Sequence, residues 1–303
     1  MLPEGGPAGG KGEVPPQPAR NGDADEHPAG AIGTLKTLAF IVVIQVLTLF
    51  ITKVNAPIVA QSGYQYAPEG TSSGGSIANV LILVVFVFAS TLAAVWLARK
   101  RRVKIFMAVV FLGTALALFL LTLLSAIAVT SSYTDAYTSL YLSIGFASAT
   151  VALLALVTLR RVPPWSALIL TGLLSAEVGS YFASTIPILT ALLLPLAFSL
   201  YDIYTVFRGP LKTLVTTLPA ETLSAISSKI GDFSIGTGDT VFYAMIPALA
   251  YNKISVPSAA ISLLAVDVGV VITLYLLSKA KLLPGLPIPM FLGLAVLLAF
   301  YFG

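Results

Sequence analysis

The chain has 303 residues, of which 57% are hydrophobic and only 10% are charged, whereas soluble globular proteins carry about 25% charged residues. Cysteine is absent and the single histidine, His27, lies in a polar N-terminal segment, which excludes disulfides, thiolate metal sites and histidine chemistry within the membrane. The net charge of +4 is spread over short segments between apolar stretches. It forms no basic face with interleaved aromatic residues, so nucleic-acid binding is not indicated.

The first 30 residues are rich in glycine, proline and charged residues. Such a composition buries too little apolar surface to fold, and residues 1–30 are therefore predicted to be a disordered tail. The segment also lacks the basic and then apolar order of a cleaved signal peptide.

The rest of the chain consists of apolar segments separated by short polar ones. A helix needs about 20 mostly apolar residues to cross the hydrocarbon core of a bilayer. The pattern predicts an all-α polytopic membrane protein whose nine transmembrane helices span residues 34–55, 76–98, 105–130, 138–159, 165–183, 186–207, 234–252, 257–278 and 285–302. Spans one to five make up an N-terminal bundle over 31–184 and spans six to nine a C-terminal part over 185–303, within one membrane domain.

The orientation of these spans is predicted from their positive charges. Lysine and arginine gather after the second, fourth, sixth and eighth spans, and the tail residues Lys11, Arg20 and Lys36 fall on the same side. Only Lys53 and Lys253 fall on the other side. Because positive residues in short loops mark the cytoplasmic face, the N-terminus is expected in the cytoplasm and the C-terminus outside a multi-pass protein of the cell membrane.

Two longer segments separate the spans, an outer loop at 56–75 and an inner loop at 208–233. The inner loop carries apolar residues at helical spacing, such as Leu211, Leu214 and Leu218. This spacing suits an amphipathic segment at the membrane surface, and a flexible linker without fixed structure is the alternative.

Four carboxylic acids lie within the predicted spans, namely Glu177, Asp202, Asp239 and Asp267. An ionisable residue in a span costs roughly 2.5–3.5 kcal/mol on insertion scales, so each is a functional candidate. Asp202 lies six positions before Arg208 and Asp239 about five positions into the next span, which puts both at a depth of roughly 8–9 Å on consecutive antiparallel helices. Glu177 and Asp267 have no obvious partner at their own depth, so a structural hydrogen bond or a water-filled cavity is the plainer interpretation for them.

The matched aspartates indicate one kind of hydrolytic chemistry. A serine–histidine device and a His-Glu-x-x-His zinc site both need a membrane histidine, which this chain lacks. Two close carboxyl groups share a proton, so one activates water while the other hydrogen-bonds or protonates a carbonyl oxygen. Such a pair needs only water, and no metal or organic cofactor is expected.

Three motifs near these residues resemble the presenilin and signal peptide peptidase family. The sixth span ends with Tyr201-Asp202, and the seventh opens with Gly236-Thr237-Gly238-Asp239. At the start of the ninth, Pro284-Gly285-Leu286-Pro287 is similar to the Pro-Ala-Leu-Pro motif, with glycine in place of alanine. A second match, Pro247-Ala248-Leu249, lies too early in the chain to be that motif. The resemblance covers the C-terminal half, and the first five spans match only in hydropathy.

This resemblance implies an intramembrane aspartic endopeptidase, most like an archaeal presenilin homologue, whose catalytic part is 185–303. Its substrates would be transmembrane-helix proteins within the lipid bilayer, and assembly into a homo-oligomer is left open. Asp202 and Asp239 would be the catalytic residues. The other motif residues would line the site or hold the substrate: Tyr201, Gly236, Gly238, Pro284, Gly285, Leu286 and Pro287.

The motif residues also have plainer interpretations. Tyr201 suits an aromatic residue at the membrane interface. Gly236 and Gly238 suit close helix packing through small residues. The resemblance to the family implies instead that they allow close approach of the backbone, or a loosened helix, before Asp239. Glycine at position 285 should be tolerated sterically but could loosen its motif.

Two other functions remain open from the residues. A proton- or cation-coupled transporter or channel could use the same intramembrane acids, although such sites favour the bilayer midplane and broken helices in corresponding halves. A non-catalytic scaffold that binds membrane helices would also fit the fold, but it would not require two acids at one depth. For a protease, the substrate helix must unwind, and an exposed backbone edge in 208–233 or after Pro284 could pair with the extended segment.

Overall fold

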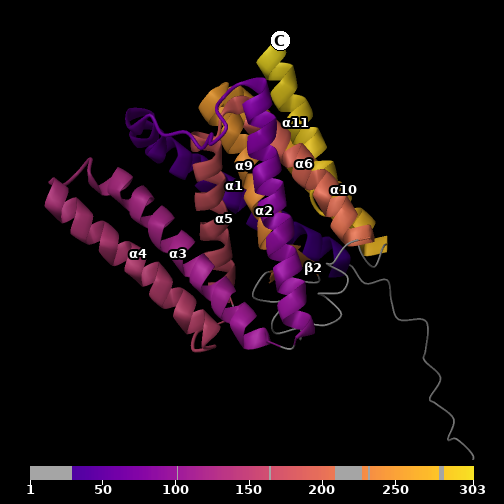
Figure 1. Cartoon of the computed structure of the whole chain (residues 1–303), viewed down its shortest axis with the longest axis horizontal. Helices are drawn as coiled ribbons and strands as arrows, with labels where there is room; N and C mark the ends of the chain where they lie inside the picture. The colour runs from indigo at the N-terminus through magenta and orange to yellow at the C-terminus, as the bar shows by residue number, and fades with distance from the viewer. Residues whose placement is uncertain (1–28, 101, 164, 209–226, 231–232, 280–282) are drawn as a thin grey trace, which may run out of the picture.

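The computed structural model describes residues 29–303 apart from 101, 164, 209–226, 231–232 and 280–282. Within these residues it contains nine helices and a two-stranded antiparallel sheet (Figure 1). In chain order the elements are α1 (Ala29–Ser62), α2 (Ser73–Arg99), α3 (Val103–Thr130), α4 (Ala136–Thr158), α5 (Trp165–Thr185), α6 (Ile188–Phe207), β1 (Ser227–Ile230), β2 (Phe233–Gly236), α9 (Thr237–Lys253), α10 (Val256–Lys279) and α11 (Pro287–Phe302). The predicted polytopic helical fold is confirmed, with the short sheet as an addition.

Seven of the described helices are long and apolar enough to cross a membrane, and the chain is a multi-pass membrane protein. The two shorter helices are α9, with 17 residues, and α11, with 16. Helix α9 packs against α1, α5, α10 and α11, and each residue from Phe242 to Ala250 is buried. It is therefore enclosed by protein and need not match the full thickness of the hydrocarbon.

The other helices are not arranged evenly around α9. Figure 1 shows α3 and α4 packed together at one side of the molecule, with α5, α1 and α9 toward its middle. Helices α2, α3 and α4 expose many large apolar side chains, among them Phe86, Leu112 and Tyr141. Such surfaces suit contact with lipid, because bilayer hydrocarbon is as apolar as the side chains themselves.

The beginning of the seventh predicted span is wrong. Residues 234–236 belong to β2, and α9 begins only at Thr237, so Asp239 is the third residue of the helix. Phe233 and Ile235 are buried while Ser234 between them is exposed, which is the alternation of a strand. Backbone pairing with β1, from Ser227 opposite Gly236 to Ile230 opposite Phe233, holds these residues extended.

Other boundaries also differ from the sequence prediction. Helix α1 continues to Ser62, through Pro57, and shortens the predicted outer loop 56–75 to 63–72. Helix α11 begins at Pro287 rather than 285. Within the inner loop, residues 209–226 lie outside the described residues, whereas 227–230 and 233 form strands, which were not predicted.

The ends of α5 and α9 that lie away from the sheet are joined through carbonyl groups of α5. The side chains of Asn252 and Lys253 donate to the carbonyl oxygens of Ala183, at 3.2 Å, and Ser184, at 3.4 Å. The amide of Tyr66 donates to the carbonyl of Thr185 at 2.9 Å. The last carbonyls of a helix have no partner within it, so these contacts fix α9 relative to α5.

Candidate active site

Asp202 lies on α6, five residues before the helix ends, and its side chain is half-buried. Its Oδ2 atom accepts a hydrogen bond of 3.0 Å from the amide of Leu286, and the amide of Gly285 also contributes. A carboxyl group held by main-chain amides has a fixed position. The segment before α11 therefore orients Asp202.

Asp239 lies in the first turn of α9 and is also half-buried. The amide of Gly236, at the N-cap, hydrogen-bonds to its carboxyl group. The carboxyl groups of Asp202 and Asp239 lie close enough to interact electrostatically. The two aspartates of the predicted pair are thus brought together, although Asp239 stands nearer the helix start than predicted.

Gly285 separates the two aspartates. A Cβ atom at this position would lie 2.7 Å from Oδ2 of Asp239 and 3.4 Å from the hydroxyl oxygen of Tyr243. Contacts under 3.0 Å are not made by real Cβ atoms, so a glycine is what allows the Asp239 carboxyl group its present place. Neighbouring residues of this segment thus contact different aspartates, since Gly285 lies against Asp239 and the amide of Leu286 donates to Asp202.

Tyr243 of α9 is a site residue that the sequence analysis did not predict. Its hydroxyl donates to the carbonyl of Gly285 at 2.9 Å, and its side chain is buried. Together with the amides bonded to Asp202, this contact holds the backbone of residues 285–286 on both sides. Tyr243 lies four positions after Asp239, which is the helical spacing that puts two side chains on one face and could have identified it.

Tyr201 connects α6 to α2. Its hydroxyl donates to Oγ1 of Thr91 at 2.8 Å, and its ring makes edge contacts with Phe88 and Phe198, at centroid distances of 6.3 and 6.2 Å. Phe198 packs in turn on Phe242 of α9, at 5.0 Å. Tyr201 is therefore part of an aromatic cluster next to the aspartates, and its described contacts support a packing role.

The two motif glycines before Asp239 differ from each other. A Cβ atom at Gly236 would lie 3.3 Å from Oδ2 of Asp239, whereas one at Gly238 would meet nothing within 4 Å. The predicted close approach of the backbone therefore occurs at Gly236, against the carboxyl group of Asp239. Of the two motif prolines, Pro284 is buried, and Pro287 is buried at the first residue of α11, where a missing amide hydrogen costs nothing.

Gly269, which positions α10 against α11, was not predicted from the sequence. A Cβ atom at Gly269 of α10 would lie 2.5 Å from the Cα atom of Pro289 and 2.8 Å from its nitrogen. The backbones of α10 and α11 therefore meet at this point. Nothing in the local sequence of Gly269 marks it, because its partner lies on another helix.

The other two intramembrane acids stand apart from the aspartate pair. Glu177 of α5 accepts a hydrogen bond of 3.1 Å from Thr122 of α3. Asp267 of α10 hydrogen-bonds to Gln45 of α1, whose amide donates to the carbonyl of Tyr243 at 3.4 Å. Each has a neutral partner on another helix, while Oδ1 of Asp267 is buried without a partner among the described residues.

Comparison with known proteins gave matches in structure only. No family model and no curated protein sequence matches this chain. One solved structure, a presenilin family intramembrane aspartate protease in space group C222, has a TM-score of 0.61 and 20% identity, over 88% of this chain and 98% of its own. A second, in space group P2, has a TM-score of 0.56 and 23% identity, over 86% and 95% of the two chains. The resemblance seen in the three motifs is therefore confirmed at the level of architecture: this chain has the fold of the presenilin family intramembrane aspartate proteases.

Proposed function

We propose that this chain is an intramembrane aspartic endopeptidase that hydrolyses peptide bonds within transmembrane helices of membrane-protein substrates. The observation that carries the proposal is the backbone of Gly285 and Leu286, which contacts both Asp202 and Asp239. Two carboxyl groups on two separate helices, α6 and α9, are thereby held by the backbone that leads into α11. The fold shared with solved intramembrane aspartate proteases supports the same conclusion.

The chemistry follows from the closeness of the two carboxyl groups. Because neighbouring carboxylates repel, the pair holds one proton between them. The ionised group removes a proton from water, which attacks the carbonyl carbon, while the protonated group hydrogen-bonds to the carbonyl oxygen. Collapse of the tetrahedral intermediate then breaks the C–N bond as a proton passes to the leaving amine. The protonation states belong to the pair rather than to either residue.

The substrate must reach this pair in extended form, because the carbonyl groups of a helix are occupied by its own hydrogen bonds. The strand β1 pairs with β2 on one side and meets no further strand among the described residues. β2 leads directly through Gly236 into α9 and Asp239. An unwound substrate segment that adds to the outer edge of β1 would therefore be anchored close to the catalytic pair.

The proposal is tested with purified protein in liposomes and a single-span substrate. Asp202→Asn and Asp239→Asn should each abolish cleavage, because asparagine cannot take the proton of the attacking water. The matched control is Asp267→Asn, the same chemical change at another buried aspartate, which should leave cleavage within about twofold of wild type. Cleavage that survives in either catalytic variant would reject the mechanism.

The same preparations separate proteolysis from transport. If the chain were a proton- or cation-coupled transporter, pH- or cation-dependent flux into the liposomes would occur and would depend on the intramembrane acids. If the wild-type protein showed flux but no cleavage, the protease hypothesis would be rejected in favour of the transporter hypothesis. If the wild-type protein showed neither cleavage nor flux, and both aspartate variants still bound substrate helices, the scaffold hypothesis would be favoured.

A further inference from the structure

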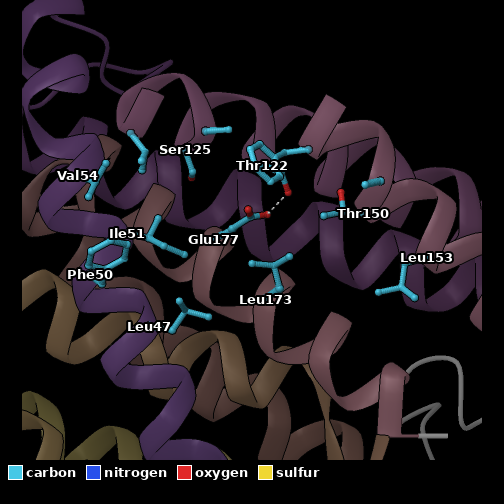
Figure 2. A pocket seen from close by; sticks show the side chains of 14 residues that line it. Leu47, Phe50, Ile51, Val54, Thr122, Ser125, Thr150, Leu153, Leu173 and Glu177 are labelled. Carbon is cyan, nitrogen blue, oxygen red and sulfur yellow. Dashed lines mark hydrogen bonds between the residues drawn. The ribbon is translucent and has the colours of Figure 1, made fainter. Parts of the chain in front are cut away.

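A cavity of about 430 Å³ lies between α1, α3, α4 and α5, none of which carries an aspartate of the pair (Figure 2). Its walls are almost entirely apolar and include Leu47, Ile51, Leu153 and Leu173. This volume falls within the range of roughly 300–1,000 Å³ typical of sites for small molecules. Such sites pair an apolar wall with a few placed polar groups, and this cavity has the hydroxyl groups of Thr122, Ser125 and Thr150 and one group that can ionise.

The group that can ionise is Glu177, whose side chain is only 3% exposed. Its Oε2 atom accepts the hydrogen bond from Thr122, and Figure 2 shows the carboxyl group among the side chains that line the cavity. Among the described residues no group hydrogen-bonds to the second oxygen, Oε1, and this oxygen is not fully buried in protein. A hydroxyl group in the cavity can therefore reach Oε1 and hydrogen-bond to it.

The depth of Glu177 limits what that ligand can be. Glu177 lies twelve residues after Trp165 and eight before Thr185, or roughly 18 and 12 Å from the two helix ends. The head group of a phospholipid stays at the bilayer surface, so it does not reach this depth. The ligand must instead be a molecule whose polar group is dissolved in the hydrocarbon together with its chain.

The charge around Glu177 limits the ligand further. None of the described residues that line the cavity is basic, and a charged carboxylate without a counter-charge is expensive within the membrane. A neutral carboxyl group both donates and accepts a hydrogen bond, as a hydroxyl group does. The two are therefore complementary, whereas an ammonium group would require the ionised form.

We propose that this cavity binds a neutral membrane amphiphile with a single hydroxyl group, of the long-chain alcohol class, whose hydroxyl bonds to Glu177. The apolar chain lies along Leu47, Ile51 and Leu153, between α1 and α4. The site is independent of the aspartate pair, which lies on α6 and α9. Binding of the ligand to this cavity, and loss of that binding in variants, can therefore be measured whether or not the chain cleaves peptides.

The test is equilibrium binding of radiolabelled hexadecanol to the purified full chain in detergent. Saturable binding is expected, with competition by unlabelled hexadecanol at about tenfold lower concentration than by hexadecane. Glu177→Leu should weaken binding about tenfold, because the hydroxyl loses its partner. Glu177→Gln keeps a donor and an acceptor and should stay within about threefold of wild type, and Asp267→Asn should leave binding unchanged.

A second variant covers the case in which Glu177→Leu does not fold. Leu173→Trp keeps Glu177 but fills the cavity, and it should abolish saturable binding while thermal unfolding stays cooperative. Equal competition by hexadecane and hexadecanol, or wild-type affinity in Leu173→Trp, would overturn the proposal. Tighter binding of hexadecylamine than of hexadecanol would also overturn it, since this result would mark a site for cations.

Discussion

A Cβ atom at position 285 would lie 2.7 Å from Oδ2 of Asp239, so the backbone of Gly285 and the carboxyl group of Asp239 are in direct contact. The next residue, Leu286, donates its amide to Asp202 at 3.0 Å. Residues 285 and 286 therefore act as a spacer between the two aspartates. Changes in this spacer should alter catalysis more than they alter folding.

The first prediction concerns Gly285→Ala. The added Cβ meets the far end of a side chain that can rotate, so the free energy of unfolding should change little, whereas the carboxyl group of Asp239 must move. Small displacements of reacting groups are costly in rate, and kcat for cleavage of a single-span substrate should fall about threefold to tenfold. Gly285→Val, with a larger side chain, should abolish cleavage.

The control for this prediction is Gly238→Ala, because a Cβ atom at Gly238 meets nothing within 4 Å. It should keep nearly full activity. Equal kcat values in Gly285→Ala and Gly238→Ala would show that contact at position 285 does not position Asp239.

The second prediction concerns Tyr243→Phe. The variant removes the hydroxyl that donates to the carbonyl of Gly285 and leaves that carbonyl without its partner. A lost hydrogen bond of this kind costs about 1 kcal/mol, which thermal unfolding should report as a lower Tm. Cleavage should also slow, because residues 285 and 286 lose one of their anchors.

Tyr201→Phe is the matched variant, since it removes the hydrogen bond from a tyrosine hydroxyl to Thr91 in the aromatic cluster. It should lower the Tm by a similar amount with a smaller loss of cleavage. A larger effect of Tyr201→Phe than of Tyr243→Phe on kcat would contradict the roles assigned to the two tyrosines.

The third prediction concerns stability. Gly269→Ala would place a Cβ atom 2.5 Å from the Cα atom of Pro289, and backbone cannot yield as a side chain can. Overpacking of this kind costs about 1–3 kcal/mol, so the Tm should fall markedly and α10 and α11 should separate. Gly145→Ala, where a Cβ atom has open space, should unfold like the wild type.

The fourth prediction concerns the pH dependence of the loop before α4. Asp135 caps this helix, and hydrogen bonds from the Thr138 hydroxyl, the Thr138 amide and the Tyr137 amide lower its pKa below the ordinary value. The stabilisation is therefore complete above the unfolded-state pKa of about 3.9 and disappears as the pH falls through the lower pKa of the folded state.

Asp135→Ala should consequently lower the Tm at pH 7, and its difference from the wild type should shrink once the pH falls below about 4. Asp135→Asn retains a side-chain cap without a titrating group, and its Tm should be less sensitive to pH over the same range. A difference between wild type and Asp135→Ala that stays constant with pH would show that the charged cap is not the cause.

The helices were predictable because hydrocarbon demands long apolar segments, and each of the nine predicted spans overlaps a described helix. The errors lie where protein rather than lipid surrounds the chain. At 234–236 the backbone pairs with β1 and becomes a strand, and α1 continues to Ser62 beyond the predicted end at 55. Hydropathy carries no information on pairing between separate segments.

The sequence by itself determined the multi-pass helical fold and selected Asp202 and Asp239, because charged residues are rare in lipid and these two lie on consecutive spans at similar depth. Only the tertiary structure decided what surrounds them. The bonds from Tyr243 to Gly285 and from Leu286 to Asp202 join residues 42 and 84 positions apart. Contacts over such separations depend on how α6, α9 and α11 pack, and no local pattern of residues encodes that packing.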